Sequence, residues 1–185
     1  SVSRFLMYQD DDQAIAALNR AIDLGITYID TAHSYGDGKS EERVGRVMAT
    51  RRNEVVLATK IAGRMADQAR RQIELSLKRL GTDHLDVLHI HALKSMDDLT
   101  TIEARGGVLE ALYEAREQKV ARAIGITCHA DPGALQTALQ RHDFDCAQMA
   151  LNAGLRSMTD GMKLAPAAPA SFERCALPVA NRKHM

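Results

Sequence analysis

The apolar residues of the chain follow two alternating spacings. Short runs rich in β-branched residues predict strands, and the stretches between them, where apolar residues recur every three or four positions, predict amphipathic helices. The expected strands are residues 26–30, 54–60, 84–92, 121–127 and 144–152. A short last helix is expected around 172–181, and the other helices start near Asp10–Asp12, Ser40, Asp67, Val108 and Asp131.

Strands separated by single helices are typical of parallel βα units, which build either a doubly wound open sheet or a (β/α)8 barrel. No GxGxxG motif follows any expected strand, and this weakens the case for a dinucleotide-binding open sheet. The 185 residues fit one domain. We therefore expect residues 1–185 to form a single α/β domain of the TIM-type (β/α)8 barrel class, incomplete here, with about strands 2–6 and their helices.

Titratable side chains stand at the ends of three successive strands. Asp30 closes the first, Lys60 closes the second and His91 closes the third, while Tyr35 lies in the loop just after Asp30. A single such residue is usually a helix cap or a surface charge. Three residues that each close a strand are harder to explain in this way. In a barrel, residues at successive strand ends converge on one face.

These four residue types form a complete set for reducing a carbonyl group. A tyrosine phenol can donate the proton that the developing alkoxide needs, and a nearby lysine ammonium favours the phenolate that remains. A carboxylate holds the lysine by a charge-assisted hydrogen bond. A neutral histidine can orient the substrate oxygen and donate to it as charge builds there. We assign these roles to Tyr35, Lys60, Asp30 and His91 respectively.

Three linked motifs in this order resemble the aldo-keto reductase family. They are DTAHSYGDGKSEERVG at 30–45, VVLATK at 55–60 and LKRLGTDHLDVLHIH at 77–91. The resemblance implies a (β/α)8 barrel with NADPH, less often NADH, across its carboxyl face. It also implies a small aldehyde or ketone as substrate. We expect residues 62–68 and 93–107 to form part of the pocket wall.

The resemblance also implies three cofactor-binding positions. Family members hold the nicotinamide amide with a Ser-Asn pair after the fifth strand and a glutamine in the sixth. The matching residues here are Thr127, Cys128 and Gln148. Thr127 keeps a hydroxyl in place of serine, whereas Cys128 carries no amide, and His129 follows it.

Composition narrows the other possibilities. Lys plus Arg and Asp plus Glu both number 24, so the net charge is zero and nothing draws the chain as a whole to nucleic acid or a membrane. The three cysteines are scattered, with no CxxC pair. No apolar run approaches the roughly 20 residues that span a bilayer, and no signal-peptide core opens the sequence. We expect a cytoplasmic protein with no metal site.

The number of strands is short of a whole barrel. A barrel of this kind needs about 250 residues, and the five expected strands correspond to the family's second to sixth. We therefore expect the sequence to be part of a longer protein. Two alternatives stay open: a non-catalytic or inactive relative, and a Schiff-base lyase that uses Lys60 as its nucleophile. The second leaves Tyr35 and His91 without a role.

Overall fold

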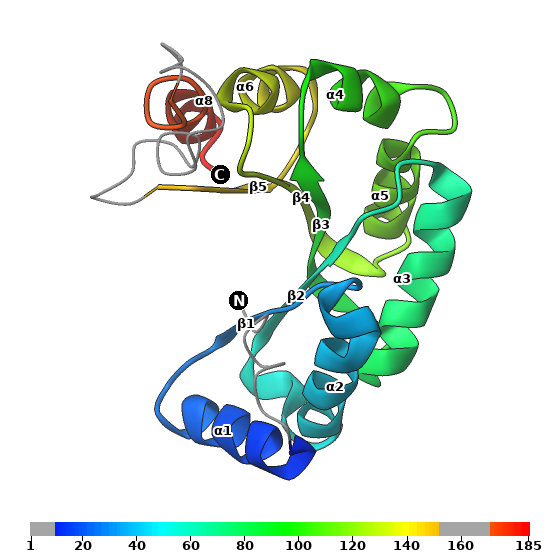
Figure 1. Cartoon of the computed structure of the whole chain (residues 1–185), viewed down its shortest axis with the longest axis vertical. Helices are drawn as coiled ribbons and strands as arrows, with labels where there is room; N and C mark the ends of the chain where they lie inside the picture. Colours follow the sequence, from blue (N-terminus) through cyan, green and yellow to red (C-terminus); the bar gives the residue numbers. More distant parts are fainter. Residues whose placement is uncertain (1–9, 152–170) are drawn as a thin grey trace.

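The computed structural model describes residues 10–151 and 171–185, and its strands form one parallel sheet in sequence order. The sheet curls into an open arc with helices along its outer side (Figure 1). This arrangement confirms the expected incomplete (β/α)8 barrel. The strands are β1 (Tyr28–Asp30), β2 (Val56–Ile61), β3 (Leu85–Leu93), β4 (Ala121–Cys128) and β5 (Cys146–Met149).

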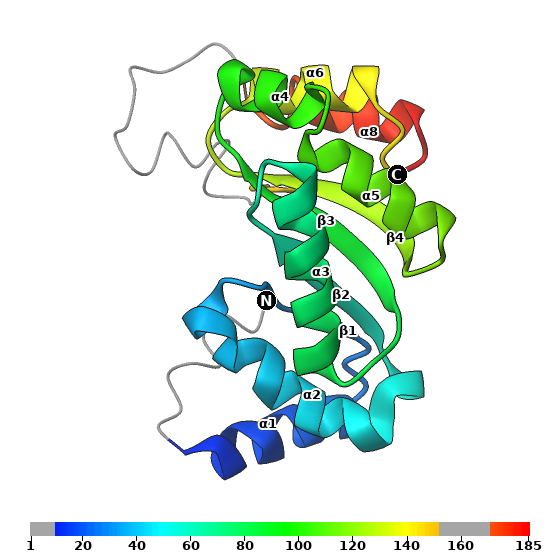
Figure 2. The ribbon, with the colours of Figure 1, turned by 90° about the vertical axis from the view of Figure 1, so that its right-hand side faces the viewer.

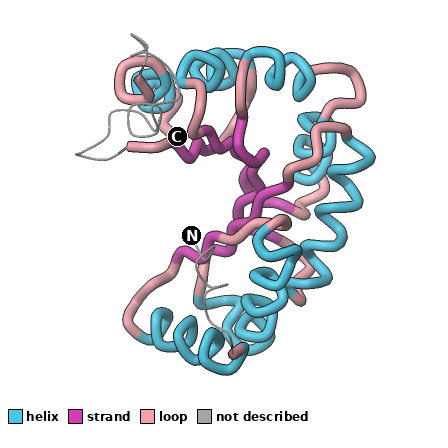
Figure 3. The backbone as a smooth tube through the Cα atoms, viewed as in Figure 1, coloured by secondary structure: helices cyan, strands magenta, loops and turns pink. Residues whose placement is uncertain are grey.

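Helices connect the strands and cover the outer side of the arc. Figure 2 views the molecule from that side, and Figure 3 shows the strands as an inner layer with the helices outside them. The described helices are α1 (Asp11–Asp23), α2 (Lys39–Arg51), α3 (Ala66–Leu80), α4 (Met96–Glu103), α5 (Val108–Glu117), α6 (Pro132–Arg141) and α8 (Ala176–Arg182). Two 3₁₀ turns, η2 (Tyr35–Gly38) and η3 (Arg52–Glu54), flank α2. Within the described ranges, no helix is both long and apolar enough to cross a membrane.

The capping residues expected from the sequence mark the helix ends. The Asp10 carboxylate accepts from the Asp12 backbone N–H at 2.9 Å, and Asp131 accepts from Ala134 N–H at 2.9 Å with Pro132 opening α6. At the other end of α3, Gly81 adopts the left-handed conformation with φ 63°. These local signals therefore place α1, α3 and α6 correctly.

Other boundaries differ from the expectation. Helix α2 begins one residue before Ser40, after Gly38 with φ 98°, and the Ser40 hydroxyl hydrogen-bonds to Thr31 at 2.9 Å instead of capping the helix. Helix α4 was not expected, because its short span buries only Leu99 and Ile102 and so has little apolar periodicity. Strand β5 covers only part of the expected 144–152, whose last residue lies outside the described residues. The expectations for the segments before residue 10 and from 154 to 170 lie outside them too.

Alternation along the strands separates two faces of the sheet. The residues of β2 and β3 that point toward the helices are completely buried, namely Leu57, Ile61, Leu88 and Ile90. On the opposite, concave face Val56 is 40% exposed and Tyr28 is 47% exposed. The core therefore lies between sheet and helices, and the polar strand-end residues belong to the concave face.

Candidate active site

Three elements bring the predicted catalytic residues to the carboxyl edge of the sheet. Asp30 is the last residue of β1, Lys60 lies next to the end of β2, and His91 lies near the end of β3. Tyr35 opens the 3₁₀ turn η2 that follows β1. Because the strands are parallel and adjacent, these positions fall on one face, and the structure brings all four side chains together.

Asp30 and Lys60 form the buried base of the cluster. The Lys60 Nζ donates to Asp30 Oδ1 at 2.5 Å and to the Thr31 carbonyl at 2.8 Å. Both side chains are only 2% exposed. A charge-assisted bond in such dry surroundings fixes the ammonium in one place.

The Tyr35 ring lies between the lysine and the histidine. Lys60 Nζ is 5.2 Å from the centre of the Tyr35 ring, and the Tyr35 and His91 ring centres are 5.7 Å apart at an interplanar angle of 77°. The Tyr35 backbone N–H donates to Ala32 O at 3.1 Å, which tightens the turn. The phenol thus has a cation on one side and an imidazole on the other.

His91 is held in its neutral form. Burial lowers the pKa of His91 to about 4, and the positive charges of Lys60, His129 and Arg64 act in the same direction. Near pH 7 the ring is an imidazole with one N–H to donate. A neutral donor beside the phenol is what the predicted orienting role requires.

A second set of contacts holds the loop that carries the tyrosine. Glu41 is fully buried and accepts from Thr59 Oγ1 at 2.7 Å and from Arg79 Nη1 at 3.4 Å. Arg79 also donates to the carbonyls of His33 at 3.3 Å and Asp37 at 3.1 Å. Helix α3 thereby anchors the loop from outside. Sequence reasoning missed this role of Arg79, whose only sequence signal is a basic residue in the last turn of a helix.

Two of the predicted cofactor residues are paired on neighbouring strands. Thr127 of β4 is the register partner of Gln148 of β5. Thr127 Oγ1 accepts from the Ala92 backbone N–H at 2.7 Å, so its hydroxyl hydrogen remains able to donate. Within the described part of the chain, the Gln148 amide makes no side-chain hydrogen bond. Thr127 is completely buried and Gln148 is half-buried. Both carry groups of the kind that pair with the carboxamide of a nicotinamide, which both donates and accepts hydrogen bonds.

Cys128 is placed differently. Adjacent strand residues point to opposite faces, and the Cys128 side chain is completely buried. Its sulfur lies 3.2 Å from Leu93 O and 3.4 Å from Asp131 O, so its single S–H can donate to either carbonyl. The structure therefore does not bring this side chain to Thr127 and Gln148. The exposed His129 follows at the end of the strand.

His89 lies one layer deeper on the concave face. It is the register partner of both Lys60 and Gly125, and it is 2% exposed. Among the described residues neither of its ring nitrogens has a hydrogen-bond partner. A methyl group added at Gly125 would lie 2.5 Å from His89 Nδ1, so the glycine leaves the space that the ring fills. Burial lowers the pKa of His89 to about 4.

This burial predicts sensitivity to acid. An unfolded chain protonates the histidine below its ordinary pKa of 6.5, whereas the folded protein does so only near 4, so stability is lost as pH falls through that window. Between pH 7 and pH 5 the free energy of unfolding should therefore decrease by about 2 kcal/mol less in His89→Leu than in the wild-type protein. Urea unfolding at both pH values measures it, with the exposed His184→Gln as control. An undiminished loss in His89→Leu would contradict the prediction.

Comparison with known proteins identifies the family. The model described as "Aldo/keto reductase family" matches residues 5–161. The chain belongs to the aldo/keto reductase family. This confirms the resemblance seen in the three sequence motifs, and it accounts for the parallel arc with reactive residues at its carboxyl edge.

Individual relatives agree with the family assignment. The chain is 40% identical over 130 residues to the aldo-keto reductase YhdN of Bacillus subtilis, covering 64% of this chain and 38% of that protein. It is 34% identical over 173 residues to D-threo-aldose 1-dehydrogenase of a Pseudomonas species, covering 76% and 51%. The fold also matches an aldo/keto reductase from Klebsiella pneumoniae solved with NADP and acetate, with TM-score 0.73, 28% identity and coverage of 95% and 56%. The chain thus spans about half, or less, of the length of these relatives.

Proposed function

We propose that the protein reduces a small aldehyde or ketone to an alcohol with NADPH, using Tyr35 as proton donor. The observation that carries the proposal is the contact of the Tyr35 ring with both the Lys60 ammonium and the neutral His91 ring. Family membership supports an NAD(P)H-dependent oxidoreductase in general. The assignment of roles to individual residues rests on the chemistry of the cluster.

Each residue has one step in the reaction. A nicotinamide cofactor, when bound, would supply the hydride for the carbonyl carbon. The Tyr35 hydroxyl gives its proton to the carbonyl oxygen, so that the product is a neutral alcohol. The Lys60 ammonium, fixed by Asp30, stabilises the phenolate left behind. His91 donates its N–H to the same oxygen and orients it before transfer.

The nicotinamide end of the cofactor fits the residues at the ends of β4 and β5. The Thr127 hydroxyl has a hydrogen to donate and the Gln148 amide can donate and accept. Because the Cys128 thiol is buried, Cys128 would contact the nicotinamide through its backbone. The Klebsiella relative was solved with NADP and, in a second structure, with NADPH. We take NADPH as the cofactor, with NADH as the alternative to be tested beside it.

A Schiff-base lyase is less well supported. Lysine attacks a carbonyl only as a neutral amine, and here the Lys60 ammonium is held by a carboxylate 2.5 Å away and by a carbonyl oxygen. The other alternative, a non-catalytic relative, would have no need of a buried lysine–aspartate pair beneath a tyrosine.

We also propose a cytoplasmic location. Cys128, Cys146 and Cys175 are all free thiols. Free thiols are typical of proteins from reducing compartments.

One assay separates the three functions. The natural full-length protein is mixed with NADPH and a panel of aldehydes and ketones, and NADPH oxidation is followed by absorbance. We expect turnover with at least one carbonyl compound. Covalent trapping of substrate on Lys60 by borohydride would instead indicate the lyase. If the protein shows neither turnover nor trapping, the result would favour the non-catalytic relative.

A further inference from the structure

The backbone directly after His91 is irregular. The register between β3 and β4 shifts between Ile90 and Leu93, and Ala92 adopts φ 53°. This left-handed conformation is disfavoured for a residue with a side chain. Such a conformation persists only where the surroundings hold it in place. The cause must therefore lie in the contacts of the Ala92 peptide groups.

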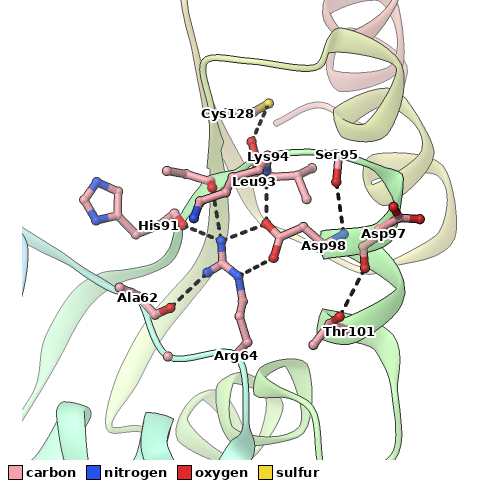
Figure 4. A network of polar contacts seen from close by, with 12 residues as sticks. Ala62, Arg64, His91, Leu93, Lys94, Ser95, Asp97, Asp98, Thr101 and Cys128 are labelled. Carbon is pink, nitrogen blue, oxygen red and sulfur yellow. Dashed lines mark hydrogen bonds and ion pairs between the residues drawn. The ribbon is translucent and has the colours of Figure 1, made fainter.

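Arg64, from the loop between β2 and α3, holds this bend from one side. Its Nη2 donates to the carbonyls of His91 and Ala92, each at 3.0 Å, and its Nη1 donates to Ala62 O at 3.2 Å (Figure 4). On the other side, the Ala92 N–H donates to Thr127 Oγ1 at 2.7 Å. The histidine and the bend are thus held between the β2–α3 loop on one side and strand β4 on the other.

Asp98 of α4 fixes the guanidinium in turn. Arg64 Nε donates to Asp98 Oδ1 at 2.7 Å and Nη2 donates to Oδ2 at 2.9 Å, which is a two-pronged ion pair. Asp98 Oδ2 also accepts from the Lys94 N–H at 3.0 Å, and the Asp98 N–H donates to the Ser95 hydroxyl at 3.2 Å. Figure 4 shows the carboxylate and the strand-end carbonyls converging on one guanidinium. The two loops expected to form the pocket wall are joined at this point.

We infer that Arg64, oriented by Asp98, is a positioning residue that sets the backbone and hence the ring of His91 for the reaction. The inference rests on the proposed function for its catalytic consequence. Arg64 donates from its Nε and from both Nη atoms, and its side chain is only 18% exposed. All three guanidinium nitrogens of Arg64 therefore donate to Asp98 or to the backbone carbonyls beside His91 and in its own loop. A lysine at this position would keep the charge, but its three N–H donors lie on one nitrogen. It therefore cannot make the two-pronged pair with Asp98 and also reach the carbonyls of Ala62, His91 and Ala92.

Arg70 offers a matched control. It makes an equally two-pronged pair with Glu114, at 2.8 Å for both contacts, but it joins the outer helices α3 and α5 and, among the described residues, touches no strand-end carbonyl. Arg70→Met therefore removes a two-pronged ion pair, together with a contact to Asp67 at 2.6 Å, without touching the bend. The Arg70 side chain is 45% exposed, against 18% for Arg64. Arg64→Met removes the pair and the clamp together.

The test compares Arg64→Met, Arg64→Lys and Arg70→Met in the full-length protein by carbonyl-reduction kinetics and by NMR. We expect kcat to fall at least about tenfold in both Arg64 variants, because small misplacements of reacting groups are costly, with KM for NADPH changed little. Arg70→Met should stay within about twofold of wild type. The backbone amide signals of His91 and Ala92 should shift in both Arg64 variants and stay in place in Arg70→Met.

The titration of His91 separates charge from position. The Lys60, His129 and Arg64 side chains act to lower the pKa of His91, the Asp30 carboxylate acts to raise it, and the Tyr35 ring centre lies 5.7 Å from that of His91. Arg64→Met should raise the midpoint, whereas Arg64→Lys should leave it nearly in place while kcat still falls. If Arg64→Met does not fold, Asp98→Asn provides the same comparison by loosening the guanidinium.

Two results would overturn the inference. One is equal loss of kcat in Arg64→Met and Arg70→Met. The other is His91 and Ala92 amide signals that do not move in Arg64→Met. If the wild-type protein reduces no carbonyl compound, the proposed function fails, and the amide signals alone then decide whether Arg64 sets the bend.

Discussion

Tyr35→Phe in the full-length protein is expected to lower kcat for carbonyl reduction by about 10²–10⁴-fold, the usual worth of a positioned general acid. Phenylalanine keeps the ring that contacts Lys60 and His91, so the geometry of the cluster should survive. What is lost is the hydroxyl that we propose protonates the alkoxide. NADPH oxidation at saturating substrate measures the loss.

The matched control is Tyr113→Phe. Tyr113 lies on α5, where its hydroxyl accepts from the Asp143 N–H at 3.3 Å and its ring packs against Arg116. Removing that hydroxyl should leave kcat unchanged within about twofold, as expected for a substitution distant from the reacting atoms. NADPH binding, followed by fluorescence, should be the same in wild type and Tyr35→Phe. Turnover by Tyr35→Phe at the wild-type rate would show that the proton comes from another group.

Lys60→Met should damage both stability and activity. It removes the ammonium that balances the Asp30 carboxylate at a site where both side chains are 2% exposed. Breaking a buried ion pair on one side costs about 3–5 kcal/mol. Without the cation the phenolate form of the tyrosine also loses its stabilisation, so carbonyl reduction should fall with it. Urea unfolding gives the first quantity and NADPH oxidation the second.

Lys39→Met is the same substitution in an exposed pair. Lys39 Nζ lies 3.5 Å from Asp11 Oδ1, and the two side chains are 50% and 44% exposed. Such a surface pair contributes about 0–1 kcal/mol, so this variant should unfold close to the wild-type urea concentration. Equal stability of the Lys60 and Lys39 variants would argue that the Lys60–Asp30 pair is not the buried base of the site.

The parts of the fold that sequence predicts well are those with local causes. Gly81 ends α3 because it can adopt a left-handed φ. Asp131 and Pro132 start α6 because the aspartate side chain caps the helix and the proline ring fixes a helical φ at its first residue. The positions of Asp30, Lys60 and His91 were equally accessible, since each follows directly from an apolar run, and Tyr35 comes in the loop after the first of them. Parallel pairing then carries these positions to one edge.

The parts that sequence could not supply depend on distant partners. Arg64 meets Asp98 across 34 positions, and Arg79 meets Glu41 across 38. Nothing near either arginine marks it as more than a surface charge. Only the curvature of the sheet, which brings successive loops together, reveals that Arg64 holds the backbone at His91 and that Arg79 holds the loop that carries Tyr35.

The cofactor positions fall between these cases. Family motifs indicate Thr127 and Cys128 as neighbours in sequence, but a strand directs neighbouring side chains to opposite faces. Thr127 meets Gln148 across the sheet while the Cys128 thiol is buried against carbonyl oxygens. Strand alternation was available in the sequence and argues for treating the two residues separately.

The most direct test of the account is the fate of a labelled hydride. The full-length protein is incubated with NADPH that carries deuterium at both positions of the carbon that transfers hydride and with an aldehyde that it reduces, and the alcohol is analysed by mass spectrometry. The account predicts deuterium bound to the former carbonyl carbon, formed by the wild-type protein and about 10²–10⁴-fold more slowly by Tyr35→Phe. An alcohol without deuterium, or labelled alcohol formed equally fast by both proteins, would contradict it.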